Sequence, residues 1–145
     1  MNGAARLFRV LWQCTWGLPQ TLAGFVLWLG CRLRGRRSFW LGGAVCTEWK
    51  RRDGVSLGLF IFCPADGGIH LHEYGHTFQS LLLGPLYVPA VLVPSMIWAG
   101  LPACARWRKR KNLPYSALYC ERWADRLGSR YRLARAKEKL RIEVK

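Results

Sequence analysis

Acidic residues are scarce in this sequence. Only 8 Asp and Glu stand against 23 Lys and Arg among 145 residues, so the formal net charge is +15. The six cysteines form no C-x-x-C pair, and those within apolar runs (Cys14, Cys31 and Cys104) are read as reduced small hydrophobic side chains. Internal repeats and low-complexity linkers are also missing, so the length corresponds to one domain. Because 51% of the residues are hydrophobic, intrinsic disorder is excluded.

The first long feature is a run of 22 uncharged residues over 10–31. This is about the length that a helix needs to cross a bilayer, so we expect an N-terminal transmembrane helix there, with a kink at Pro19. A cleavable signal peptide is the alternative, but no A-x-A-like cleavage site ends the run. Four residues recur at helical spacing within it: Gln13, Gly17, Gln20 and Gly24. Such a small, polar stripe is expected to face another helix or a wet cavity.

The second uncharged run covers 77–105 and contains four prolines. Basic residues follow both runs: Arg32, Arg34, Arg36 and Arg37 after the first, and five of the six residues 106–111 after the second. The positive-inside rule keeps both basic segments on the cytoplasmic side, so the second run is expected to enter and leave on one face, as a Pro-broken re-entrant hairpin over 84–105. Anionic lipid headgroups are then the expected partners of the basic residues, and nucleic acid is the weaker reading.

The remaining segments suggest regular structure outside the membrane. Two β-leaning stretches flank an Asp-Gly turn and predict a β-hairpin over 42–63, although its second half also suits a buried apolar segment. Helices are expected over 69–83 and, rich in Arg and Lys, over 115–142. The predicted fold is thus a mainly α membrane protein in a single domain over 1–145. It would have one transmembrane helix, a small hairpin, two further helices and the membrane hairpin.

The helix expected over 69–83 carries the motif H-E-x-x-H, formed by His72, Glu73 and His76. Residues four apart share one face of a helix, so both imidazoles can reach one zinc ion. Glu73 then lies beside that site, where it can accept a proton from metal-bound water. The alternative is a helix whose histidines only form hydrogen bonds or line the surface.

Two acids four residues apart, Glu121 and Asp125, share a face of the C-terminal helix. A catalytic zinc takes three protein ligands, so Glu121 can supply the third. Asp125 can accept a hydrogen bond from a ligand imidazole and fix its orientation. Taken alone, these acids could instead pair with neighbouring arginines such as Arg122.

The sequence HEYGH followed by ERWADRLG resembles the paired motifs of integral-membrane gluzincin metallopeptidases, a group that includes the CAAX prenyl proteases and bacterial heat-shock membrane proteases. It is also similar to a compact set of bacterial proteins with HEYGHT-x-QS-LLGPLY. The similarity covers roughly 56–128. It implies His72, His76 and Glu121 as zinc ligands, Glu73 as general base and Asp125 as a supporting residue. The expected location is the bacterial inner membrane, with the site on the cytoplasmic side that the positive-inside rule indicates.

The expected function is zinc-promoted hydrolysis of peptide bonds, in a peptide or a membrane protein, at the cytoplasmic membrane face. The chain is shorter than those peptidases and has no His after His76 to stabilise an oxyanion. Four residues could substitute: Tyr115, Tyr119, Arg122 or Tyr131. Gln79 could touch substrate or instead satisfy a backbone group. The alternative function is a non-catalytic basic membrane protein with a structural or degenerate metal site.

Overall fold

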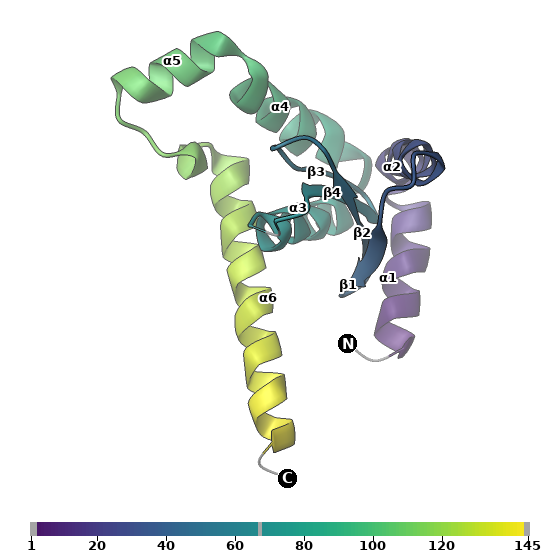
Figure 1. Ribbon diagram of the computed structural model, residues 1–145. Coiled ribbons are helices and arrows are strands. Elements are labelled where there is room, and N and C mark those ends of the chain that lie inside the picture. The colour runs from purple at the N-terminus through teal and green to yellow at the C-terminus, as the bar shows by residue number, and fades with distance from the viewer. Residues whose placement is uncertain (1–2, 67, 144–145) are drawn as a thin grey trace.

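The computed structural model describes residues 3–66 and 68–143, and these form six α-helices and a four-stranded mixed sheet (Figure 1). The expectation of a mainly α membrane protein is therefore wrong. The sheet lies at the centre of the molecule, with helices on both sides and the long C-terminal helix extending beyond them.

The N-terminal apolar run does not form the single helix expected over 10–31. It divides into α1 (Gly3–Thr15) and α2 (Leu18–Leu33). The break lies at Trp16 and Gly17: Gly17 is the N-cap of α2, and Pro19 falls in the first turn of that helix, where its missing N–H costs least. Across the described residues, no single helix is long and apolar enough to cross a membrane; Val88–Gly100 and Pro102–Arg110 pass that test only together, at a bend of 74°.

Polar side chains in this N-terminal region point into the protein. Gln13 donates a hydrogen bond to the Thr77 carbonyl at 3.3 Å, and Gln20 donates to Ser80 Oγ at 3.0 Å. Both glutamines are buried, so the polar stripe does face another helix, as expected. Gly24, the last member of the stripe, instead lies against the backbone of Leu57.

The sheet contains β1 (Ser38–Leu41), β2 (Ala44–Trp49), β3 (Val55–Leu57) and β4 (Phe60–Pro64) in the order β1-β2-β4-β3. Strand β2 runs parallel to β4, and β3 pairs antiparallel with β4. The hairpin expected over 42–63, with its turn at Asp53-Gly54, is therefore wrong. The tight turn lies at Gly58, whose φ of +62° favours glycine, so β3 folds back onto β4 rather than onto β2.

Strand β4 separates two apolar layers because successive side chains point to opposite faces. Phe60 and Phe62 pack with residues of α1 and α2, including Trp28. Ile61 and Cys63 pack on the other face, against the helix that carries the H-E-x-x-H motif. The strand is thus buried on both faces and anchors that helix to the centre of the molecule.

Helix α3 (His70–Leu83) carries this motif and crosses helix α6 (Tyr119–Glu143) at close range. A Cβ on Gly75 would overlap the carbonyl oxygen of Ala124, and a Cβ on Gly128 would overlap that of Leu71. Both glycines therefore allow backbone-to-backbone contact. This close approach brings the first turn of α6 beside the H-E-x-x-H residues.

The segment between α3 and α6 is helical but repeatedly broken. It contains η1 (Gly84–Leu86), the π-helical turn η2 (Val88–Leu92), α4 (Val93–Gly100), α5 (Pro102–Arg110) and η3 (Tyr115–Ala117). Four of its five prolines fall in the first turns of η1, η2, α4 and α5, where a missing N–H costs least. The hairpin expected over 84–105 is instead a chain of short helices whose last member extends to Arg110.

Candidate metal centre

Helices α3 and α6 bring together three side chains that could hold a metal ion: His72, His76 and Glu121. The Nε2 atoms of the two histidines are 3.1 Å apart. Glu121 Oε2 lies 3.0 Å from the first of them and 3.5 Å from the second. Four equidistant ligands on a zinc ion at about 2.05 Å are spaced roughly 3.3 Å apart, so this triangle fits the ion.

The charge distribution in the triangle also favours a cation. Glu121 is completely buried, and its Oε2 faces the Nε2 atoms of both histidines at 3.0 and 3.5 Å. The neighbouring imidazole nitrogens point their lone pairs at the same place when the ring protons are on Nδ1. Three electron-rich atoms facing one point, in a buried setting, are stabilised by a proton or by a metal ion.

Hydrogen bonds at the far side of each imidazole select that tautomer. His72 Nδ1 lies 2.7 Å from Asp125 Oδ1, and His76 Nδ1 lies 2.6 Å from Gln79 Oε1. Both acceptors favour a proton on Nδ1, which leaves Nε2 free to bind metal. Gln79 is fixed in turn, since its amide donates to the Cys120 carbonyl at 2.7 Å. Gln79 therefore orients the His76 ring and also satisfies a backbone group.

Ionisation in the metal-free site follows from the same contacts. Burial lowers the pKa of His72, but hydrogen bonds to Glu121 and Asp125 outweigh it and raise the pKa to about 9. Burial raises the pKa of Glu121, whereas hydrogen bonds from both histidines lower it well below its usual range. The site thus holds a proton next to a carboxylate at neutral pH, and a metal ion must displace that proton.

Glu73 lies on α3 between the two histidines and is buried. Its Oε2 accepts a hydrogen bond from Ser56 Oγ at 2.8 Å. Its carboxyl group packs against Gly54, where any Cβ would overlap it. Burial raises the pKa of Glu73, opposed by the nearby His76 and His72. A carboxylate held this way is a stronger base than an exposed one.

The triangle opens into a cavity of about 1110 Å³. Glu73, Tyr87 and Tyr115 line it together with the metal-site residues. The Tyr115 ring lies 6.4 Å from the His72 ring, centroid to centroid. Burial and the Glu121 carboxylate raise the pKa of Tyr115 to about 12, so its hydroxyl remains a hydrogen-bond donor at neutral pH. An open cavity beside three ligands is typical of catalytic rather than structural zinc sites.

The other oxyanion candidates lie outside this arrangement. Tyr119 is exposed, and its hydroxyl donates to the Ala90 carbonyl. Arg122 donates to the carbonyls of Ser116 and Ala117 at 3.3 and 3.4 Å. The Tyr131 ring lies against the Tyr74 ring, tilted by 44° with the centroids 4.2 Å apart. Of the four, only Tyr115 lines the cavity.

Two serines at the site carried no signal in the sequence. Ser56 donates a hydrogen bond to Glu73, and Ser95, on α4, lines the same cavity as Glu121 and Tyr115. Neither belongs to a motif, and each reaches the site through a separate segment of the chain. Only their place in the folded structure marks them.

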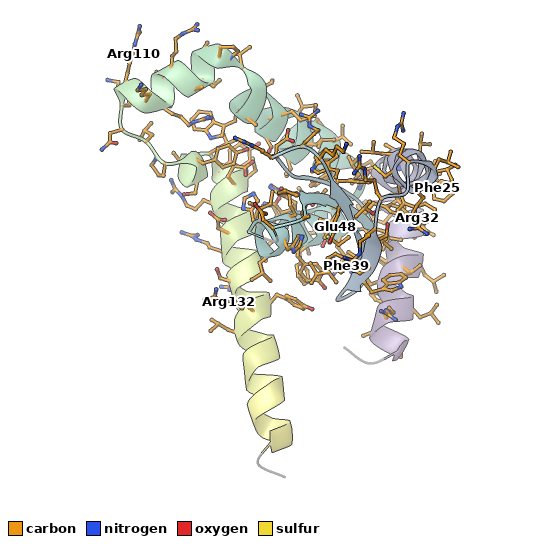
Figure 2. All side chains as sticks on the ribbon, viewed as in Figure 1. Phe25, Arg32, Phe39, Glu48, Arg110 and Arg132 are labelled. Carbon is orange, nitrogen blue, oxygen red and sulfur yellow. The ribbon has the colours of Figure 1, made fainter. Side chains whose placement is uncertain are left out.

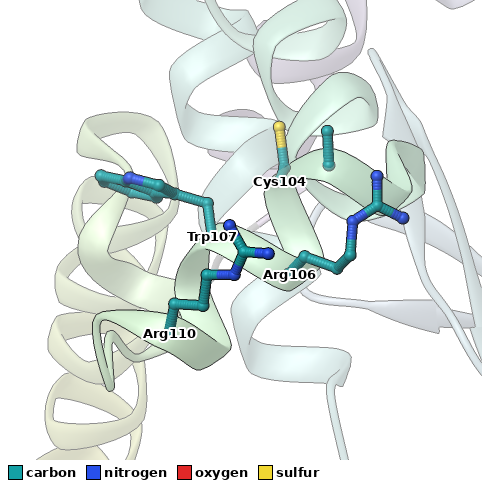
Figure 3. A pocket seen from close by; sticks show the side chains of 5 residues that line it. Cys104, Arg106, Trp107 and Arg110 are labelled. Atoms are coloured by element: carbon teal, nitrogen blue, oxygen red, sulfur yellow. The ribbon is translucent and has the colours of Figure 1, made fainter.

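A second group could also hold a metal ion among the residues that the structure describes: Cys46, Cys63 and His70. A different hollow, on α5, is lined by Cys104, Trp107 and two arginines (Figure 3). That hollow contains no acid or histidine, so the site chemistry belongs to the larger cavity. Comparison of the chain with protein-family models, with curated proteins and with solved structures found no match.

Proposed function

We propose that the protein is a zinc-dependent peptidase that uses His72, His76 and Glu121 as ligands. One observation carries the proposal: three buried or half-buried ligand atoms converge at zinc-like spacing beside a buried Glu73, at the wall of a large cavity. The similarity of HEYGH and ERWADRLG to the gluzincin motifs supports the same reaction. A structural metal site would instead be closed to substrate.

Each residue of the site has its own role in the proposed hydrolysis. Bound zinc supplies acidified water and a polarised carbonyl. Glu73 accepts a proton and returns it to the leaving amine, roles that its raised pKa favours. Tyr115 donates a hydrogen bond to the developing oxyanion. Asp125 and Gln79 keep the imidazoles in orientation through the Nδ1 contacts.

One strand in the cavity wall is available for backbone pairing with an extended substrate. Strand β4 (Phe60–Pro64) is internal to the sheet, between β2 and β3, so it offers no free edge to a substrate. Strand β3 is one of the two edge strands, and all three of its residues line the cavity. The Tyr87 hydroxyl donates a hydrogen bond to the Ser56 carbonyl at 2.9 Å, so this backbone group of β3 is already paired. A peptide could pair with what remains of this short edge.

We further propose that the protein acts at an anionic lipid surface. Helices α1 and α2 expose large apolar side chains: Leu7, Phe8, Leu11, Trp12, Trp16, Leu18, Leu22, Phe25, Val26, Leu27, Leu29 and Leu33. Figure 2 shows Phe25 on the outer side of α2 and Arg32 near the end of that helix. Exposed apolar side chains beside a cluster of arginines are complementary to acyl chains beneath anionic headgroups. Such a surface would place the site close to peptides at the membrane or to membrane proteins. The location of the site on the cytoplasmic side of the membrane stays a prediction.

The decisive test compares wild type with Glu73→Gln, using zinc-loaded protein and a library of peptides whose cleavage is read by mass spectrometry. We expect wild type to cleave peptides within the chain. Glu73→Gln should lose activity by about 10²–10⁴-fold, because a general base is removed, while the zinc content is unchanged. His76→Ala should lose the zinc ion of this site and, with it, the activity.

Equal cleavage by wild type and Glu73→Gln would contradict the mechanism, since contamination would then explain the products. Loss of zinc in Glu73→Gln would assign Glu73 a structural role. Absence of both cleavage and hydroxamate binding, with zinc still present, would support the non-catalytic alternative.

Lipid binding is tested by sedimentation with vesicles of phosphatidylglycerol or phosphatidylcholine. We expect binding to the anionic vesicles and at least a tenfold loss in Leu22→Glu/Val26→Glu, which charges the apolar face of α2. Leu133→Glu is the matched control, because Leu133 is equally exposed but lies on α6. Equal binding by all three proteins would contradict the proposed surface.

A further inference from the structure

The second cluster lies between the sheet and the start of α3. Cys46 on β2 and Cys63 on β4 are completely buried on the sheet face that α3 covers. His70 is the first residue of α3, and its ring meets the Phe39 ring edge-on at 5.7 Å between centroids. One ligand atom from each of the three residues lies within 4.8 Å of the others.

One atom of this cluster is unsatisfied. His70 Nε2 is buried and has no hydrogen-bond partner among the described residues. A buried imidazole nitrogen without a partner is costly unless something binds it. Both thiols lie within 4.8 Å of a ring nitrogen of His70, and zinc binds thiolates together with imidazole.

Geometry and charge both suit a metal ion. Two thiolates bound to zinc at about 2.3 Å are separated by roughly 3.8 Å, within the observed grouping. Two thiolates, one neutral imidazole and a divalent ion have zero net charge. A neutral complex is far less costly to bury than an isolated thiolate in this apolar layer.

A disulfide suits the strand register less well. Cys46 is opposite Ile61 in the parallel pair, and Cys63 is opposite Glu48, so the cysteines are diagonal neighbours. Strand spacing and rise place such a pair about 8 Å apart at Cα. Disulfides usually require about 4.4–6.8 Å. A metal ion can bridge the longer span because it adds two metal–sulfur bonds.

We propose that Cys46, Cys63 and His70 form a second metal centre, a structural zinc site that ties the first turn of α3 to the sheet. This site is separate from the cavity and has a different donor set. It holds the helix that carries His72 and His76 in position. The proposal does not depend on peptidase activity, since it concerns metal binding alone.

Cobalt(II) distinguishes the two centres in the full-length chain after removal of metal by a chelator. Thiolate ligands give a sulfur-to-cobalt charge-transfer band, which a site of two histidines and a glutamate cannot give. We expect the band in wild type and in His76→Ala/Glu121→Ala, and its loss in Cys46→Ser/Cys63→Ser. Zinc content should fall from two per chain in wild type to one in each double variant.

Cys104→Ser is the control for removal of a thiol and should keep the band and both zinc ions. If the double cysteine variant fails to fold, His70→Ala decides, because it leaves both thiols in place and should weaken cobalt binding at least tenfold. Absence of the band in cobalt-loaded wild type would overturn the proposal. So would an intact mass lower by two hydrogens in freshly purified wild type but not in Cys46→Ser/Cys63→Ser, which would show a disulfide between these two cysteines.

Discussion

The two metal-capable clusters share one helix but differ in their surroundings. His70 and His72 are two residues apart, so they project from opposite sides of the first turn of α3. His72 faces α6, a carboxylate and a cavity, and its second nitrogen contacts Asp125. His70 faces two buried thiols and an aromatic ring, away from the cavity.

The different surroundings suit the cavity cluster to catalysis and the thiol cluster to a structural role. The cavity cluster combines hard and borderline donors with supporting hydrogen bonds and an adjacent buried base, which are the requirements for activating water. The thiol cluster combines soft donors with apolar walls, which favour a closed site. Substitutions that affect one cluster and spare the other therefore test whether the distinction is real.

Gly75→Ala is expected to give the largest difference between the effects on the two clusters. The new Cβ would collide with the Ala124 backbone and force α3 and α6 apart, so Glu121 would move away from both histidines. We expect overpacking to cost about 1–3 kcal/mol in the free energy of unfolding. Zinc affinity at the cavity cluster should fall by at least about 100-fold, while the thiol cluster, which uses the sheet, keeps its cobalt charge-transfer band.

Gly100→Ala is the matched control, since nothing lies within 4 Å of an added Cβ at that position. It should leave zinc affinity and unfolding unchanged. If Gly75→Ala bound zinc as wild type does, the close crossing of α3 and α6 would not be what positions Glu121.

The origin of each cluster explains how far the sequence could predict it. His72 and His76 are related by helical spacing, and α3 begins and ends within one residue of the expected 69–83. Glu121 and Asp125 share a helix face by the same rule. The contact between the two helices depends on Gly75 and Gly128, whose close packing no local pattern specifies.

The thiol cluster could not be predicted in this way. Cys46, Cys63 and His70 meet only because β2 lies parallel to β4, a pairing set by long-range packing rather than by the Asp-Gly turn. The single transmembrane helix expected over 10–31 is wrong for a related reason. Its length and lack of charge satisfy a transmembrane criterion, but Gln13 and Gln20 find buried partners on α3, and Gly17 ends the first helix.

A smaller effect is expected from the residues that hold the ligand imidazoles. Gln79→Ala and Asp125→Ala each remove one Nδ1 partner, a change that typically costs 10–100-fold in metal affinity. Gln79 is fully buried, whereas the Asp125 side chain is 49% exposed and water can replace it. Zinc titration against a competing chelator should therefore show the greater loss in Gln79→Ala. A greater loss in Asp125→Ala would mean that burial does not decide the strength of this support.

The smallest effect is expected from Phe39→Leu, which tests the wall of the thiol cluster. Phe39 meets His70 edge-on from the edge strand β1, and it is 38% exposed, so the change removes an aromatic contact without opening the core. Such contacts contribute about 0.5–1.5 kcal/mol beyond area burial, so cobalt affinity at the thiol cluster should fall about two- to tenfold. Titration of the charge-transfer band measures this loss, and zinc affinity at the cavity cluster serves as the internal reference. If both clusters weakened equally, the two faces of α3 would be coupled, and the helix would transmit the change in ring packing from one metal centre to the other.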